Sequence, residues 1–156
     1  MPNKRLVRIA LEDAPPPPSS YAEADRRQAV DDILRENRFE PVGMGEGPFS
    51  LHLMIREGRL VFDIRDAEDR PIRAIVLVLG PFRRLIKDYM MLVDAHEAAV
   101  TDGAMDARVQ AIDMGRRGLH NEAAELVTQR LEGRVGLDFE TARRLFTLIA
   151  ALHTRV

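Results

Sequence analysis

One ten-residue segment, DMGRRGLHNE, places two acids, two arginines and an imidazole close together in the chain. Within it, His120 is a candidate general base because histidine titrates near neutral pH, and Asp113 or Glu122 could orient its ring. Arg116 and Arg117 could stabilise negative charge on a substrate. The segment is therefore compatible with a small hydrolase or transferase that acts on an anionic substrate.

A second group of basic residues follows the last expected strand. Pro81 suits the first position of a helix, so Arg83 and Arg84 fall in the first turn, where positive charge opposes the helix macrodipole. A helix start that carries guanidinium groups resembles an anion site. Together with Arg116 and Arg117, these side chains are our predicted contacts for an anionic ligand or a protein partner.

A purely structural role is the alternative for both groups. Arg84 and Asp88 stand one helical turn apart and can form an ion pair, and Asp113 can pair with Arg116 or Arg117 in the same way. Adjacent helical residues diverge by about 100°, so a doublet sends one arginine toward a neighbouring element. Four expected helices carry such doublets: Arg26-Arg27, Arg83-Arg84, Arg116-Arg117 and Arg143-Arg144. A non-catalytic binding or adaptor protein is our leading interpretation, and the enzyme is the alternative.

The sequence lacks the residues that several common metal, nucleophile and phosphate sites require. The chain has no cysteine, which removes disulfides, thiolate metal sites and cysteine nucleophiles. His96-Glu97 begins like a zinc-protease motif, but valine occupies position 100, so the second histidine is missing. The glycine-rich run at 43–47 leads into a strand and offers no helix start for a phosphate. We therefore expect neither a metal nor a cofactor.

The composition is that of a soluble globular protein. The 156 residues are 46% hydrophobic and 31% charged, and 23 basic against 25 acidic residues give a net charge of −2. This balance provides no global attraction to DNA or to an anionic membrane. The sequence shows no signal peptide and no apolar run of about 20 residues, so we expect a cytoplasmic protein. A homo-oligomer or larger assembly stays open, because the last expected helix is very apolar.

The strands expected to position these residues lie in the first half of the chain. Alternating apolar residues predict a first strand at 5–11 and a β-hairpin around Gly58, with its strands at 49–55 and 60–64. A strand at 72–79 completes the meander, and residues 39–42 can add a short edge strand. The run 75–79 is apolar on both faces, as in a central strand. His52 is out of phase with the apolar face and is expected to be exposed.

Helices dominate the second half. A proline-rich spacer at 15–19 precedes a helix that Ser20 and Glu23 open as a capping box. A second helix is expected from Pro81 to about residue 96, followed by a loop at 101–104. Glycines at 115 and 118 are expected to separate a third helix at 106–114 from a fourth at 121–131. Asp138 is expected to cap the last helix. The order predicts one α+β domain, 1–156, with a small antiparallel β-meander packed against four or five helices.

Four blocks of the chain resemble a known family. They are NRFEPVG at 37–43, PFRRLIKDY at 81–89, AIDMGRRGLHNE at 111–122 and DFETARRLFTLIAALH at 138–153. Together they resemble uncharacterised protein family 0262 of the alphaproteobacteria, over roughly residues 5–153. The resemblance implies a soluble bacterial protein with no assigned activity, and it transfers no catalytic residue.

Overall fold

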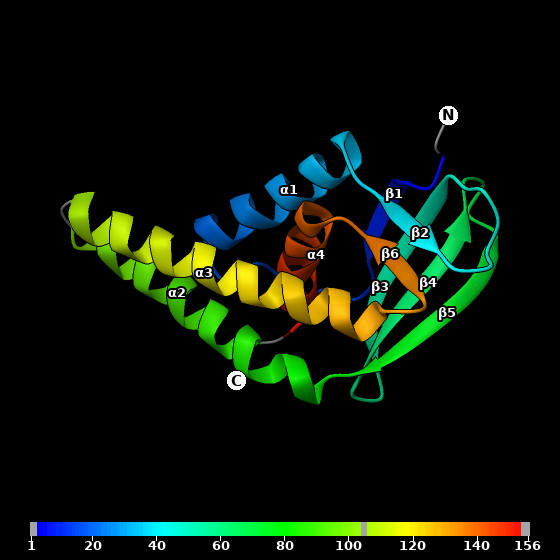
Figure 1. The fold of residues 1–156 in the computed structure, drawn as a ribbon. Coiled ribbons are helices and arrows are strands. Elements are labelled where there is room, and N and C mark those ends of the chain that lie inside the picture. The colour runs from blue at the N-terminus through cyan, green and yellow to red at the C-terminus, as the bar shows by residue number, and fades with distance from the viewer. Residues whose placement is uncertain (1–2, 104–105, 154–156) are drawn as a thin grey trace.

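The computed structural model describes residues 3–103 and 106–153. Its elements follow in this order: β1 (Leu6–Leu11), α1 (Ser20–Arg35), β2 (Phe39–Pro41), β3 (Phe49–Arg56), β4 (Arg59–Asp66), β5 (Pro71–Val78), the 3-10 helix η1 (Gly80–Phe82), α2 (Arg83–Thr101), α3 (Asp106–Leu131), β6 (Val135–Leu137) and α4 (Phe139–Ala151). In Figure 1, α2 and α3 form a long hairpin that projects from the sheet, and α4 lies among α1, α3 and the sheet. The α+β class is confirmed.

The main sheet has four strands in the order β1-β3-β4-β5. The predicted meander is confirmed, because β3 pairs with β4 and β4 with β5 in antiparallel fashion. β1 differs from the purely antiparallel expectation: it pairs with β3 in parallel, from Leu6 beside Phe49 to Leu11 beside Leu53. A parallel neighbour needs a long crossover connection, which α1 and β2 provide here.

Two strand expectations need correction. β5 lies at the edge of the sheet and not at its centre, although it is apolar on both faces. The short strand β2 does not extend the main sheet but pairs with β6 in a separate two-stranded ribbon. Neither placement could be read from residue alternation, because alternation reports which faces of a strand are buried and not which strands pair.

The core lies between the sheet and the helices. On one face of β3 and β4 the alternate apolar residues are buried, as predicted, except that Ile55 is only partly buried, and α2, α3 and α4 cover that face with apolar side chains. Ser50 and His52, on the other face of β3, are buried as well. Fully buried residues include Phe49, Leu51, Leu53, Leu60, Phe62, Ile64, Phe82 and Phe146. The apolar side chains between the sheet and the helices are therefore removed from solvent.

Helix starts match their predicted positions closely. The N-cap of α1 is Ser19, one residue before the expected Ser20, and its hydroxyl accepts from the backbone N–H of Ala22 at 3.1 Å. Asp138 occupies the N-cap position of α4 as predicted. Its side chain does not cap a backbone amide of α4, but accepts from the backbone N–H of Arg38 at 3.2 Å and from the Thr141 hydroxyl. The predicted loop at 101–104 is a turn after Thr101, and residue 104 lies outside the described residues.

The predicted break at Gly115–Gly118 is wrong. α3 runs without interruption from Asp106 to Leu131, so the segment around His120 is helical throughout and forms no corner between two helices. Each glycine lowers helix stability by about 1 kcal/mol relative to alanine, which packing against α2 and α4 can offset. The tertiary contacts of α3 therefore override the local preference of its glycines.

Replacing Gly118 with alanine is expected to stabilise the protein by about 0.5–1 kcal/mol. A Cβ atom at Gly118 would meet no heavy atom within 4 Å, and the backbone there is helical. At Gly115 a Cβ would lie 3.4 Å from Leu92 Cδ2, so alanine there should gain less. Urea unfolding of the two variants checks this ranking. A Gly118→Ala variant less stable than the natural protein would contradict a continuous α3.

Candidate functional site

His120 is buried between α3 and α4, at 4% exposure. Its Nδ1 lies 2.8 Å from the carbonyl oxygen of Arg116 and its Nε2 lies 2.8 Å from the Thr147 hydroxyl. A carbonyl only accepts, so Nδ1 carries the proton and Thr147 donates to Nε2 when the ring is neutral. Burial lowers the pKa of His120, which favours this neutral form. Phe146 and Tyr89 pack edge-on against the ring.

The two acids proposed to orient His120 have other surroundings. Glu122 forms an ion pair with Arg84 on α2, and among the described residues neither Glu122 nor Asp113 hydrogen-bonds the imidazole. Both ring nitrogens already have partners of a different kind. The catalytic role of His120, Asp113 and Glu122 thus stays a prediction, without the carboxylate–imidazole contact that it required.

The four predicted arginine contacts have different surroundings. Arg84 pairs with Asp88 at 3.1 Å and with Glu122. Arg116 pairs with Asp25 of α1 at 2.9 Å. Arg83 and Arg117 are exposed and form no ion pair with the residues that the structure describes. Two of the four charges are therefore neutralised within the chain.

A network of polar side chains joins the helices at this point. Asp25 accepts from the Tyr89 hydroxyl of α2 and from Arg116 Nη1 of α3, and only 14% of the Asp25 side chain is exposed. Burial, and then the Asp25 carboxylate, raise the pKa of Tyr89, so its hydroxyl stays protonated and donates. The Arg116 guanidinium also lies 5.8 Å from the centre of the Tyr21 ring. Three helices are thus held together by one carboxylate.

A polar cavity of about 240 Å³ opens beside this network. Three arginines and three acids line it, together with His120, Thr147, Gln28 and Ala29. Each arginine has an acid within 4.0 Å, as seen in the pairs Arg116–Asp25, Arg143–Glu140, Arg144–Glu140 and Arg144–Asp32. The charges in this cavity balance one another, so it offers little net attraction to an anion.

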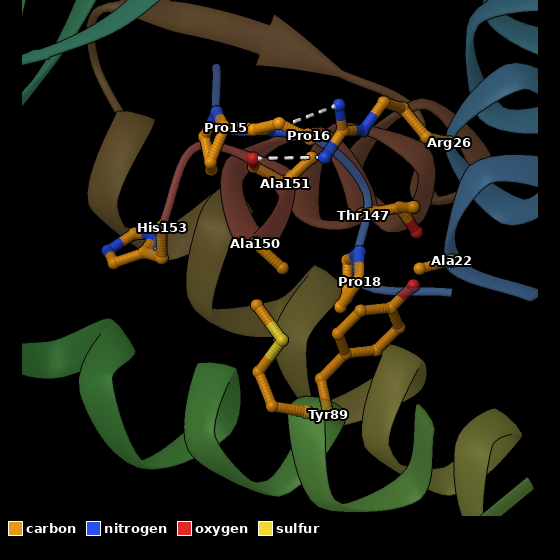
Figure 2. Close-up of a pocket in the computed structure, with 11 residues that line it drawn as sticks. Pro15, Pro16, Pro18, Ala22, Arg26, Tyr89, Thr147, Ala150, Ala151 and His153 are labelled. Carbon is orange, nitrogen blue, oxygen red and sulfur yellow. Dashed lines mark hydrogen bonds between the residues drawn. The ribbon is translucent and has the colours of Figure 1, made fainter. Parts of the chain in front are cut away.

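A second cavity, of about 60 Å³, lies on the other side of Thr147. Figure 2 shows the residues that line it. Most are apolar, and they come from the proline segment, α1, α2 and α4: Pro15, Pro16, Pro18, Ala22, Met90, Ala150 and Ala151. The polar ones are Arg26, Tyr89, Thr147 and His153. An apolar cavity with a few converging polar groups is the usual form of a small-molecule site.

The local sequence explains why this cavity forms. Prolines need no partner for a backbone N–H, so residues 15–18 can cross the end of α4 as a stiff segment without leaving amides unpaired. α1 begins directly after them at its Ser19 cap. Ala22 and Arg26 then stand one turn apart on the same face, and the small Ala22 leaves space that Arg26 borders.

Arg26 is the unusual residue of this cavity. Its Nη1 donates to the Pro15 carbonyl at 3.2 Å and its Nη2 to the Ala151 carbonyl at 3.3 Å, whereas its Nε has no partner in the described chain. Among the residues described, no carboxylate forms an ion pair with it, and burial lowers its pKa. A partly buried guanidinium normally has an anionic partner. His153 adds a second unpartnered atom, Nε2, at the same cavity.

The sequence did not single out Arg26 as a site residue. It indicated only that one member of the Arg26-Arg27 doublet would point toward a neighbouring element. Arg27 pairs with Glu23 one turn away and is exposed, while Arg26 points inward. The nearby proline segment was the available signal, but its approach to α4 depends on tertiary packing.

His52 was expected to be exposed, but the structure shows that it is buried. It is only 9% exposed, and it lies between two carboxylates, with Nδ1 2.7 Å from Glu12 Oε1 and Nε2 2.8 Å from Asp69 Oδ1. Both carboxylates accept, so the ring is an imidazolium in this arrangement. Burial acts to lower the pKa of His52, but the two hydrogen bonds raise it more, and the net pKa is above its usual value.

The stability that His52 provides should therefore depend on pH. A raised pKa in the folded state means that the contribution is complete below the unfolded pKa of about 6.5 and is lost as pH rises through the folded pKa. We expect His52→Gln to cost about 1 kcal/mol more at pH 5.5 than at pH 9. Urea unfolding of both proteins at the two pH values checks this. A cost that is equal or larger at pH 9 would show that the imidazolium form is not the stabilising one.

Comparison with known proteins decides the family. The model of an uncharacterised protein family, UPF0262, matches residues 3–155. The chain belongs to UPF0262. A UPF0262 protein of Granulibacter bethesdensis is 53% identical over 99% of this chain and 92% of its own length, and one of Acidiphilium cryptum is 55% identical over 97% and 93%. A relative from Maricaulis maris is 47% identical, and no solved structure matches.

Two other features are absent from the part of this UPF0262 protein that the structure describes. Within residues 3–103 and 106–153, no group of three or more histidine, aspartate or glutamate side chains is arranged to hold a metal ion. Over the same residues, no helix has both the length and the apolar character needed to cross a membrane.

Proposed function

We propose that this UPF0262 protein binds a short-chain organic carboxylate in the cavity beside Arg26. The observation that carries the proposal is a partly buried guanidinium that borders an apolar cavity and has no carboxylate partner in the described chain. Among the residues that the structure describes, acceptors are present for two of its five N–H groups. A carboxylate in the cavity would supply both the missing charge and further acceptors.

The apolar walls of the cavity determine which group can be attached to the carboxylate of the ligand. Its other walls are proline, alanine and methionine side chains, which favour an alkyl chain over a polar one. A buried water needs roughly 10–15 Å³ of this kind of space, so about 60 Å³ corresponds to about four waters. We therefore expect an acid of about four to six non-hydrogen atoms, such as butyrate.

The proposal replaces the arginine contacts expected from the sequence. Arg84 and Arg116 already have carboxylate partners within the chain, and the polar cavity that Arg116 lines is balanced by its own acids. Arg83 and Arg117 are exposed side chains that border no cavity described above. We favour Arg26 as the anion contact because its guanidinium is partly buried and has no carboxylate partner in the described chain. An exposed arginine is already solvated and gains little binding free energy from an added anion.

Isothermal titration calorimetry with butyrate and butyramide tests the proposal. The two molecules have the same size and shape, but only butyrate carries a charge. With about 0.7–1 kcal/mol for each of six non-hydrogen atoms, butyrate should bind with a Kd between about 40 µM and 1 mM. Butyramide should bind at least about tenfold more weakly. Equal binding of the two, or no saturable binding of butyrate, would contradict the proposal.

A further inference from the structure

The edge strand β5 has the composition of a central strand. Its residues from Ile75 to Val78 are all apolar, so both faces of the strand carry hydrophobic side chains. Ile75 and Leu77 are buried against the helices, whereas Val76 is 44% and Val78 56% exposed. Within the described parts of the chain, one edge of β5 pairs with β4, and the other edge is the open end of the sheet.

Natural sheets usually protect such an edge. Lysines, prolines within the strand, bulges or a covering helix prevent another strand from pairing there. β5 has eight residues, contains no lysine and has its proline only at the first position. Its pairing with β4 is irregular at Ile72, beside that proline, and is regular from Arg73 to Val78. In Figure 1, β5 lies along the outer side of the sheet, opposite the helical hairpin. Its outward N–H and C=O groups are available to another chain.

A groove of about 450 Å³ follows this edge. One wall is residues 73–76 of β5, and the other is formed by Val42 and Met44 after β2 and by Gly133 and Arg134 before β6. Arg73 and Arg134 are its charged residues, and none of the described residues that line it is an acid. Neither guanidinium forms an ion pair with any residue in the described parts of the chain. The groove thus combines unpaired backbone, apolar surface and two unneutralised cations.

We propose that an extended segment of a partner protein, with acidic side chains among apolar ones, pairs with β5 as a fifth strand of the main sheet. Backbone hydrogen bonds along the open edge would provide affinity, and alternate side chains would give specificity. Apolar residues of the segment would contact Val42 and Val76, and its carboxylates would pair with Arg73 and Arg134. This proposal does not depend on carboxylate binding beside Arg26.

Charge favours such a partner over a second copy of this chain. β5 carries Arg73 and no acid, so two β5 strands paired with each other would add positive charge to a groove that already holds two cations. An acidic segment removes that imbalance. A self-paired edge is therefore the competing outcome, and the experiment below distinguishes it.

Hydrogen exchange of the β5 amides, measured by NMR with defined peptides, tests the proposal. The probe is an eight-residue peptide of alternating valine and glutamate, and the control peptide has lysine in place of glutamate. The acidic peptide, at up to about 1 mM, is expected to slow exchange of the outward amides in residues 72–78 at least about tenfold. The lysine peptide should not. Arg73→Glu and Arg134→Glu should each weaken binding by about fivefold, whereas the exposed Arg130→Glu should not.

Three results would overturn the proposal. The first is no added protection of β5 by the acidic peptide. The second is equal protection by both peptides, because the cations would then play no part. The third is protection of β5 that appears without peptide and grows with protein concentration, which would assign the edge to a second copy of the chain.

Discussion

Replacing Arg26 with glutamine is expected to weaken butyrate binding by about 10- to 100-fold. The substitution removes the positive charge but keeps a side chain that can still donate to a carbonyl such as that of Pro15 or Ala151. A hydrogen bond to a charged group contributes about 1.5–3 kcal/mol, which corresponds to this loss of affinity. Calorimetry on the natural protein and the variant, at the same salt concentration, measures the change.

The neighbouring arginine supplies the matched control. Arg27 has the same charge one position later on α1, but it is exposed and pairs with Glu23 at 2.9 Å. Arg27→Gln should therefore bind butyrate with the affinity of the natural protein. If Arg26→Gln loses stability yet keeps its affinity, the guanidinium serves only to hold the end of α4 against the proline segment. That result would contradict the proposed function.

Replacing Asp25 with alanine is expected to lower the free energy of unfolding by about 2–3 kcal/mol. The change leaves the Tyr89 hydroxyl and the Arg116 guanidinium without their carboxylate partner. Removing one member of a fully buried ion pair costs about 3–5 kcal/mol, and the partial exposure of the Arg116 side chain, 31%, reduces that value. Urea unfolding followed by circular dichroism provides the measurement.

Two variants show whether the network carries this effect. Asp31→Ala, at an exposed position on the same helix, should change stability by less than about 0.5 kcal/mol. In the Arg116→Ala background, Asp25→Ala should cost less than it does alone, because the charge that it leaves unpaired is already absent. Equal costs in both backgrounds would show that Asp25 and Arg116 do not stabilise each other.

Much of the fold could be predicted from local patterns. The alternation in β3 and β4, the turn at Gly58, Pro81 near the start of a helix and Asp138 at the N-cap position of α4 are all determined by nearby residues, and all appear in the structure. Pairing partners are not determined locally. For this reason the parallel β1–β3 pair and the edge position of β5 were not predicted.

The contacts of the candidate site residues were even harder to predict from local sequence than the strand pairings. Gly115 and Gly118 suggested a corner between two helices next to His120, but contacts with α2 and α4 keep α3 continuous, and the ring is buried between α3 and α4. The pair of Arg84 with Asp88, one helical turn away, was predicted and is present. The second partner of Arg84 and the partner of Arg116 lie 38 and 91 positions away in the chain and could not be predicted. Arg26 could not be predicted as a site residue, because its burial and its lack of a carboxylate partner among the described residues depend on the tertiary structure.

The most direct measurement follows the Arg26 Nε–H signal in a ¹H–¹⁵N spectrum while butyrate is added. Assignment through the Arg26→Gln variant identifies the signal, since it alone should disappear from the arginine region. Carboxylate binding in the cavity predicts a saturable shift of this signal, with the Kd found by calorimetry, and little change for Arg27. An Arg26 signal that does not move while butyrate binds would place the carboxylate elsewhere and would contradict the proposed function.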